Sequence, residues 1–131
     1  MESIEVVDRY YERLANRDRS GLLELLSPDI TIEYHAQTEH FPWAGTFHGI
    51  EGFDRFFTVI AEHLDVIDVV RDLAVSSEDT VVVPCRGHWR VRATATDVRG
   101  GMLNLFTVVD GRITRYEVYA DTAAFLDAMS T

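Results

Sequence analysis

Residues 80–120 constrain the fold most strongly, because apolar and polar side chains alternate there over three successive runs. This alternation predicts three long strands, at residues 80–96, 99–110 and 112–120. Residues 97–101 are expected to form the first turn. The second turn is expected at Asp110-Gly111, since Asp-Gly between two alternating runs is a strong hairpin signal.

A sheet with strands this long has to twist, so it is expected to curl and to present a concave face. Pro84 and Gly87 interrupt the first long strand and are candidate positions for a kink or a bulge. The segments that precede the sheet are expected to close its concave face.

Apolar residues recur at helical spacing in residues 3–16 and 51–64, which predicts two amphipathic helices, with a short helix at 21–26 between them. Residues 30–34 alternate as a strand that places Ile32 and Tyr34 on one face and His35 on the other. Residues 36–49 are interpreted as a long loop. Residues 65–76 are interpreted as a strand whose inner face carries Ile67, Val69, Leu73 and Val75, with Arg71 as the polar exception.

Helices that precede antiparallel strands indicate an α+β fold. The chain of 131 residues is expected to form one domain, 1–131, with a substantial core, since 47% of its residues are hydrophobic. Its net charge of −10 disfavours nucleic acid and anionic membranes as partners. A single cysteine, Cys85, and the absence of a signal-like or membrane-spanning stretch lead us to expect a cytoplasmic protein.

Several segments resemble the nuclear transport factor 2-like superfamily, and within it the SnoaL-like group. The similar segments are VVDRY at 6–10, DRSGL at 18–22, PDITI at 28–32, PWAGTFHG at 42–49, DGRITRY at 110–116 and YAD at 119–121. The resemblance implies a cone, in which a curved sheet wraps around the N-terminal helices and encloses an apolar pocket. It also implies that a homodimer forms through the outer face of the sheet.

The catalytic residues of two groups in this superfamily match the sequence poorly. Relative to the steroid isomerases, Tyr10 matches the oxyanion-hole tyrosine, but Tyr34 stands at the base position. The acid position falls near Leu105, or on Asn104 if the register shifts by one residue. Relative to the polyketide cyclases, the position of the base falls near Val118. Asp121 follows later, where it is interpreted mainly as a helix N-cap.

A dehydratase-like site is the enzymatic alternative that remains. There His88 or His35 would act as the base, and Tyr10 and Tyr34 would donate hydrogen bonds to a carbonyl. A competing interpretation turns His88 outward together with its neighbouring arginines, because Trp89 and the other apolar residues of this strand should face the pocket.

The sequence therefore predicts a pocket for a small apolar, cyclic or aromatic ligand, without a cofactor or a metal. The expected activity is a cofactor-independent isomerisation, cyclisation or dehydration of a polyketide-like substrate. The alternative is a non-catalytic module for ligand binding or for dimeric assembly. The ligand-binding residues expected beside the catalytic candidates are Trp43, Trp89, Tyr116, Cys85, Leu105 and Val118.

Overall fold

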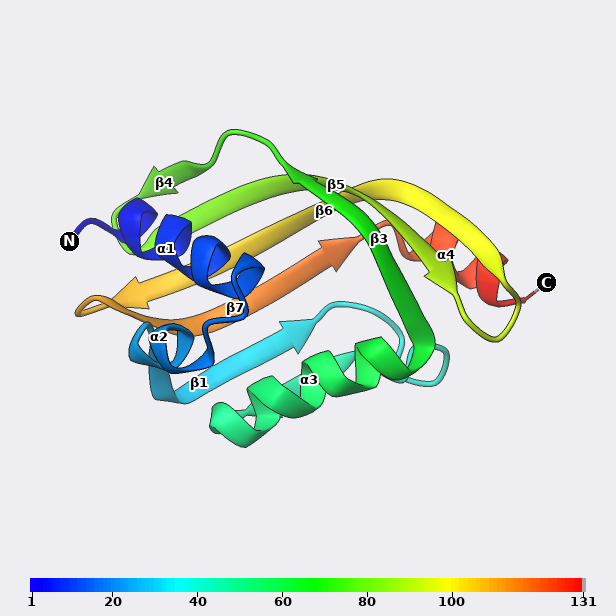
Figure 1. Cartoon of the computed structure of the whole chain (residues 1–131), viewed down its shortest axis with the longest axis horizontal. Helices are drawn as coiled ribbons and strands as arrows, with labels where there is room; N and C mark the ends of the chain where they lie inside the picture. Colours follow the sequence, from blue (N-terminus) through cyan, green and yellow to red (C-terminus); the bar gives the residue numbers. More distant parts are fainter. Residues whose placement is uncertain (131) are drawn as a thin grey trace.

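A strongly curved sheet of seven strands forms the centre of the computed structural model, which describes residues 1–130 (Figure 1). The helices are α1 (Ser3–Ala15), α2 (Arg19–Glu24), α3 (Gly49–His63) and α4 (Thr122–Met129). The strands are β1 (Leu26–Tyr34), β2 (Gly45–His48), β3 (Leu64–Arg71), β4 (Val75–Ser77), β5 (Thr80–Val91), β6 (Thr96–Val109) and β7 (Arg112–Ala120). This arrangement confirms the α+β fold with a curved sheet and N-terminal helices.

The strand order is β2-β1-β7-β6-β5-β3, and β4 pairs with β5 beyond the end of β3. Every pair is antiparallel except β1 and β7, which run parallel. The sheet is therefore mixed and not wholly antiparallel as expected. The parallel pair forms where β7, the last strand of the β5–β6–β7 meander, lies beside β1.

One of the two predicted turns is confirmed and the other is wrong. Asp110 and Gly111 adopt positive φ angles of 51° and 76° between β6 and β7. The turn between β5 and β6 lies at residues 92–95, where Ala95 takes a φ of 55°, and not at 97–101. Gly100 instead lies inside β6, directly opposite Gly87 of β5.

The single strand predicted at 65–76 is divided into β3 and β4. A bulge between Val66 and Asp68 shifts the register of β3 against β5. Val69 and Arg71 border the pocket as predicted for the inner face. The predicted inner position Ile67 is 49% exposed and does not border the pocket, because the bulge places Val66 there instead. Leu73 and Val75 are 89% and 65% exposed, because the chain leaves the sheet after Arg71 and β4 forms only its edge.

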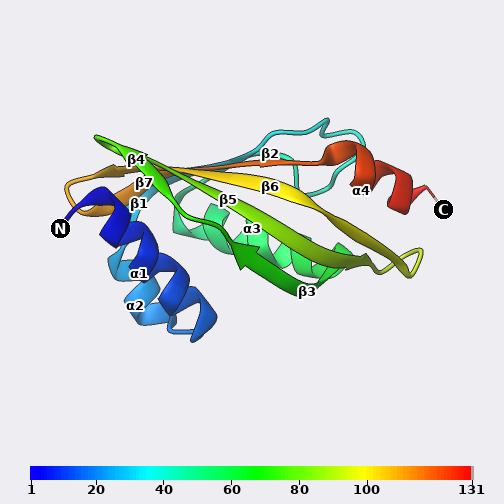
Figure 2. The same cartoon turned by 90° about the horizontal axis from the view of Figure 1, so that it is seen from above.

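Helices α1, α2 and α3 all lie on the same side of the sheet (Figure 2). The apolar stripes of α1 and α3 bury Val7, Tyr10, Phe53 and Phe56, as their spacing predicts. Helix α4 packs at the far end of the sheet from α1 (Figure 1), and the Asp121 carboxylate accepts a hydrogen bond from Ala124 N at 3.2 Å. This contact confirms the interpretation of Asp121 as an N-cap.

Candidate functional site

A cavity of about 810 Å³ opens between α1, α3, β3 and the concave face of the sheet. Its wall is mostly aromatic and aliphatic. The lining residues that α3 and β3 supply are Phe56, Phe57, Ile60, Leu64, Val66, Val69 and Arg71. A cavity of this size and composition is typical of a small-molecule site.

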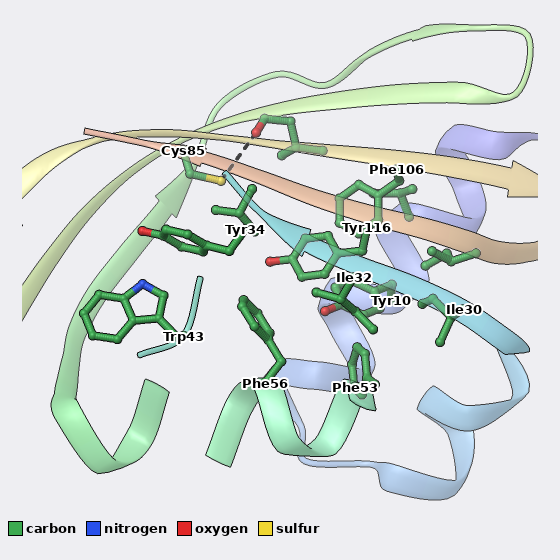
Figure 3. Packing of buried hydrophobic residues seen from close by; sticks show 14 of the residues in the cluster. Tyr10, Ile30, Ile32, Tyr34, Trp43, Phe53, Phe56, Cys85, Phe106 and Tyr116 are labelled. Atoms are coloured by element: carbon green, nitrogen blue, oxygen red, sulfur yellow. Dashed lines mark hydrogen bonds between the residues drawn. The ribbon is translucent and has the colours of Figure 1, made fainter. Parts of the chain in front are cut away.

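Six of the ten site residues predicted from the sequence border this cavity. They are Tyr10, Tyr34, Trp43, Trp89, Tyr116 and Val118. Figure 3 shows Tyr34, Trp43, Tyr116 and Tyr10 gathered around Phe56. The loop before β2 supplies Trp43, whose ring meets that of Tyr34 edge-on at 6.1 Å between centroids.

Two buried donors in this wall have no hydrogen-bond partner among residues 1–130. They are the Tyr10 hydroxyl and the Trp43 indole Nε1–H, and the two side chains are 1% and 0% exposed. Buried polar atoms normally have partners, so an unpartnered pair beside a cavity indicates contact with a ligand or with water.

Burial raises the pKa of all four pocket tyrosines. The pKa of Tyr34 rises because its hydroxyl is desolvated by burial. Desolvation also raises the pKa of Tyr10 and Tyr116 well above the usual tyrosine value. The phenols therefore remain protonated at neutral pH and act as hydrogen-bond donors.

Trp89 faces the cavity because Gly87 leaves room for its ring. A Cβ atom at position 87 would lie 2.1 Å from the Trp89 ring. The pairing of β5 with β6 runs without a register shift, so Gly87 is not a bulge and the alternation of β5 is preserved. Trp89 therefore points inward and His88 outward, as the competing interpretation of this strand predicted.

Neither histidine of the dehydratase-like assignment borders the cavity. His88 Nε2 lies 3.1 Å from an Asp97 carboxylate oxygen on the outer face, and the Arg90 Nε–H donates to the same carboxylate at 2.9 Å. The hydrogen bonds from Arg90 and then His88 lower the pKa of Asp97. A base at His88 would have to act through the sheet, so we withdraw this assignment.

His35 is held in an ion-pair network on the outer face of β1 and β7. Its Nε2 lies 2.9 Å from Glu117 Oε1, its Nδ1 lies 3.4 Å from Glu33 Oε2, and its ring stacks on Tyr119. The strand alternation that turns Tyr34 inward turns His35 outward. We therefore withdraw His35 as a base for a molecule in the pocket.

Leu105 and Cys85 lie outside the cavity wall, and Asn104 takes the place expected for Leu105. Asn104 is 3% exposed, faces inward from β6 and borders the cavity, whereas Leu105 faces the other way. The position of the steroid-isomerase acid therefore falls on Asn104, which is the alternative that the sequence allowed with a register shift of one residue. Cys85 is buried behind Asn104, and desolvation raises the pKa of its thiol.

Tyr11 and Arg71 were not among the predicted site residues, and Asn104 stood only as the register-shifted acid position, yet all three border the cavity. Tyr11 has the helical spacing of a core residue. Arg71 was recognisable as the one charged side chain on an otherwise apolar strand face. Its guanidinium carbon lies 4.3 Å from the centroid of the Tyr11 ring, and Asp8 and Glu12 complete this charged rim of the cavity.

Within the described chain, one group of side chains brings potential metal ligands together. Glu33, His35 and Glu117 place ligand atoms within 4.8 Å of one another. Arg115 also donates to Glu33 at 2.6 Å and lies 3.2 Å from the Glu117 carboxylate. Since the guanidinium already binds both carboxylates, this donor set suits an ion-pair network better than a metal centre.

No helix in residues 1–130 is both long enough and apolar enough to span a membrane. No curated protein matches the chain. Solved structures resemble it closely over nearly the whole length of both chains.

A nuclear transport factor 2-like protein from Burkholderia thailandensis superposes with a TM-score of 0.87 at 23% identity, covering 98% of each chain. TerC, crystallised with polyporic acid, gives 0.85 at 23% identity, also with 98% of each chain. A protein assigned as a SnoaL-like polyketide cyclase from Jannaschia sp. CCS1 gives 0.81 at 22% identity, covering 98% of this chain and 92% of that one. These likenesses establish the fold.

The sequence profile of the SnoaL-like domain matches residues 7–116. This match runs from α1 into β7 and so includes most of the elements that enclose the cavity. The chain therefore belongs to the SnoaL-like domain family and has the fold of the nuclear transport factor 2-like proteins.

Proposed function

We propose that this protein binds a small, largely apolar, cyclic or aromatic molecule in the cavity between α1, α3 and β3. The observation that carries the proposal is a cavity of about 810 Å³ with an aromatic wall that retains unpartnered buried polar atoms. Aromatic faces suit flat rings, and the few polar atoms would fix the orientation of the ligand. The co-crystallisation of the similar protein TerC with polyporic acid supports this ligand class.

A second candidate function is cofactor-independent isomerisation, cyclisation or dehydration of a polyketide-like substrate. Tyr34 and Trp43 favour it, because a phenol and an indole N–H side by side can polarise one carbonyl oxygen. With both histidines on the outer face, the proton acceptor would come from the rim carboxylates Asp8 or Glu12. The deep wall of the described pocket holds tyrosines and no imidazole or carboxylate, which favours binding over turnover.

A pair of tryptophan substitutions on adjacent residues of β3 tests the location of the site. Val69 faces the cavity, whereas Val70 lies outside its wall. We expect naphthalene to bind the unmodified protein and Val70→Trp with equal affinity, and Val69→Trp at least tenfold more weakly. Isothermal titration measures the three affinities. Equal affinities in all three proteins, or no binding by any of them, would refute the proposed pocket.

We further propose a homodimer that forms through the outer face of the sheet. This face exposes Val70, Leu103 and Tyr119, at 47%, 44% and 43%. Charged groups of both signs, including Arg86 and Asp97, lie among them. Interleaved opposite charges suit contact with a second copy of the same face.

A further inference from the structure

Asn104 is the one inward-facing amide in the described pocket wall, and its nitrogen is fully engaged. Nδ2 donates to the Tyr11 hydroxyl at 2.7 Å and to Cys85 Sγ at 3.8 Å. Oδ1, on the other side of the amide, is buried without a hydrogen-bond partner among residues 1–130. Because Asn104 borders the cavity, a ligand bound there is the group that can reach this unsatisfied acceptor.

The thiol of Cys85 explains why the amide adopts this orientation. Its S–H donates to Val83 O at 3.7 Å, as the dashed line in Figure 3 shows. The sulfur is then left as an acceptor, so the amide must turn its NH₂ group toward it. The reverse orientation would bring Oδ1 against the lone pairs of the sulfur.

Tyr11 supplies a donor beside this acceptor. Its oxygen accepts from Asn104, and its O–H also interacts with the Cys85 thiol, so a ligand at the cavity wall would take this proton in place of the sulfur. Arg71 over the ring and edge contacts with Tyr10 and Phe106, at 5.2 and 5.7 Å, hold the phenol in place. Burial raises the pKa of Tyr11, which keeps the phenol protonated.

We propose that Tyr11 and Asn104 together recognise a neutral hydroxyl group, phenolic or enolic, on the molecule bound in the cavity. A hydroxyl accepts from the Tyr11 O–H and donates to Asn104 Oδ1, so it satisfies both groups at once. A ketone, an ether or an enolate has no proton to donate and leaves Oδ1 unpartnered. This inference rests on the proposed binding function and specifies its ligand class.

Three matched probes test the preference at pH 7: 2-naphthol, 2-methoxynaphthalene and naphthalene. We expect 2-naphthol to bind the unmodified protein about tenfold more tightly than its methyl ether, as one added hydrogen bond of ordinary strength implies. In Asn104→Leu this ratio should fall to about one, while naphthalene still binds. Tyr11→Phe should weaken 2-naphthol and its methyl ether relative to naphthalene, because both oxygens lose the Tyr11 donor, which provides a second test if Asn104→Leu folds poorly.

Val69→Ala is the control, because it shortens an apolar part of the wall and should weaken all three probes alike. Equal affinities of 2-naphthol and its methyl ether in the unmodified protein would overturn the inference, as would a ratio that survives in Asn104→Leu or a Tyr11→Phe variant that binds both oxygen-bearing probes as tightly as the unmodified protein. Failure of all three probes to bind would instead overturn the proposed binding function. The two failures are therefore distinguishable.

Discussion

Tyr34 is the residue whose position links fold and ligand most directly. It ends the inward face of β1, is 6% exposed, and meets Trp43 from the loop before β2. Its hydroxyl is kept protonated by burial. These properties make it a donor to a polar atom of the ligand.

We predict that Tyr34→Phe weakens ligand affinity or turnover and leaves the fold intact. Loss of one hydrogen bond should reduce the affinity for a carbonyl-bearing ligand such as 1-tetralone roughly three- to tenfold. Isothermal titration measures the affinity, and circular dichroism checks the fold. An unchanged affinity and rate would remove Tyr34 from the site.

Gly87 is required for the position of the Trp89 ring. In Gly87→Ala the new Cβ would collide with that ring, and we expect a loss of about 1–3 kcal/mol in the free energy of unfolding. Gly101→Ala is the control, because its nearest atom beyond its chain neighbours lies at 4.0 Å and the change should be within about 0.5 kcal/mol. Urea denaturation measures both, and equal stabilities would contradict the packing argument.

Asn104 and Gly100 show which residue-scale features the sequence left undetermined. From the sequence, either Asn104 or Leu105 could face the cavity from β6. The observed pairing of β6 with β5 turns Asn104 inward. Gly100 and Gly101 looked like turn residues. Gly100 lies inside the strand, opposite Gly87, where an added Cβ would meet the Asp121 side chain at 3.5 Å. A tertiary contact of this kind leaves no signal in local sequence.

At the scale of elements, helical and hairpin signals predicted most of the structure. The stripes of α1 and α3 and the Asp110-Gly111 turn are found where periodicity and turn chemistry place them. The edge strands β3 and β4 were merged into one, because a bulge and a three-residue gap have no periodic signature. The β5–β6 turn was misplaced since Ala95, with positive φ, is not a typical turn residue.

Asp121 caps α4, and its removal should destabilise that helix without affecting the ligand. We expect Asp121→Ala to lower the free energy of unfolding by about 1 kcal/mol, because the hydrogen bond to Ala124 N is lost. Asp121→Asn should be close to the unmodified protein, since Asn caps equally well. A loss of ligand affinity in both variants, with stability unchanged, would assign Asp121 to the site instead.

The ion-pair network of Glu33, His35, Arg115 and Glu117, which joins β1 to β7, should make the stability of the fold depend on pH. Burial alone would raise the pKa of Glu117, but His35 and Arg115 lower it overall. A depressed carboxylate pKa stabilises the folded state above the unfolded value of about 4.3, and this contribution disappears as pH falls through the folded value. The advantage in Tm of the unmodified protein over Glu117→Gln should therefore shrink from pH 5 to pH 3.

Thermal unfolding across this pH range checks the prediction. Glu39→Gln is the control, since Glu39 is exposed and forms no ion pair in the described chain. Its difference in Tm from the unmodified protein should stay constant with pH. A constant difference for Glu117→Gln as well would contradict the stabilising role of the network.

At the scale of the whole molecule, the two faces of the sheet differ in the residues that they carry. The concave face encloses the cavity, and the outer face carries exposed apolar residues among charges. We predict that Leu103→Glu, at the 44% exposed position on β6, converts a dimer into a monomer. Sedimentation equilibrium measures the oligomeric state, and Glu62→Gln, on the exposed side of α3, is the control. An unmodified protein that is monomeric would contradict the proposed dimer.

The occupancy of the cavity is the central claim, and a crystal structure of the purified protein soaked with 2-naphthol tests it most directly. We predict ring-shaped density between Phe57 and Tyr34, with the hydroxyl within hydrogen-bond distance of Asn104 Oδ1 and the Tyr11 oxygen. A cavity closed by Trp43 and Trp89, with no density for the probe, would contradict the claim and favour a non-catalytic assembly module.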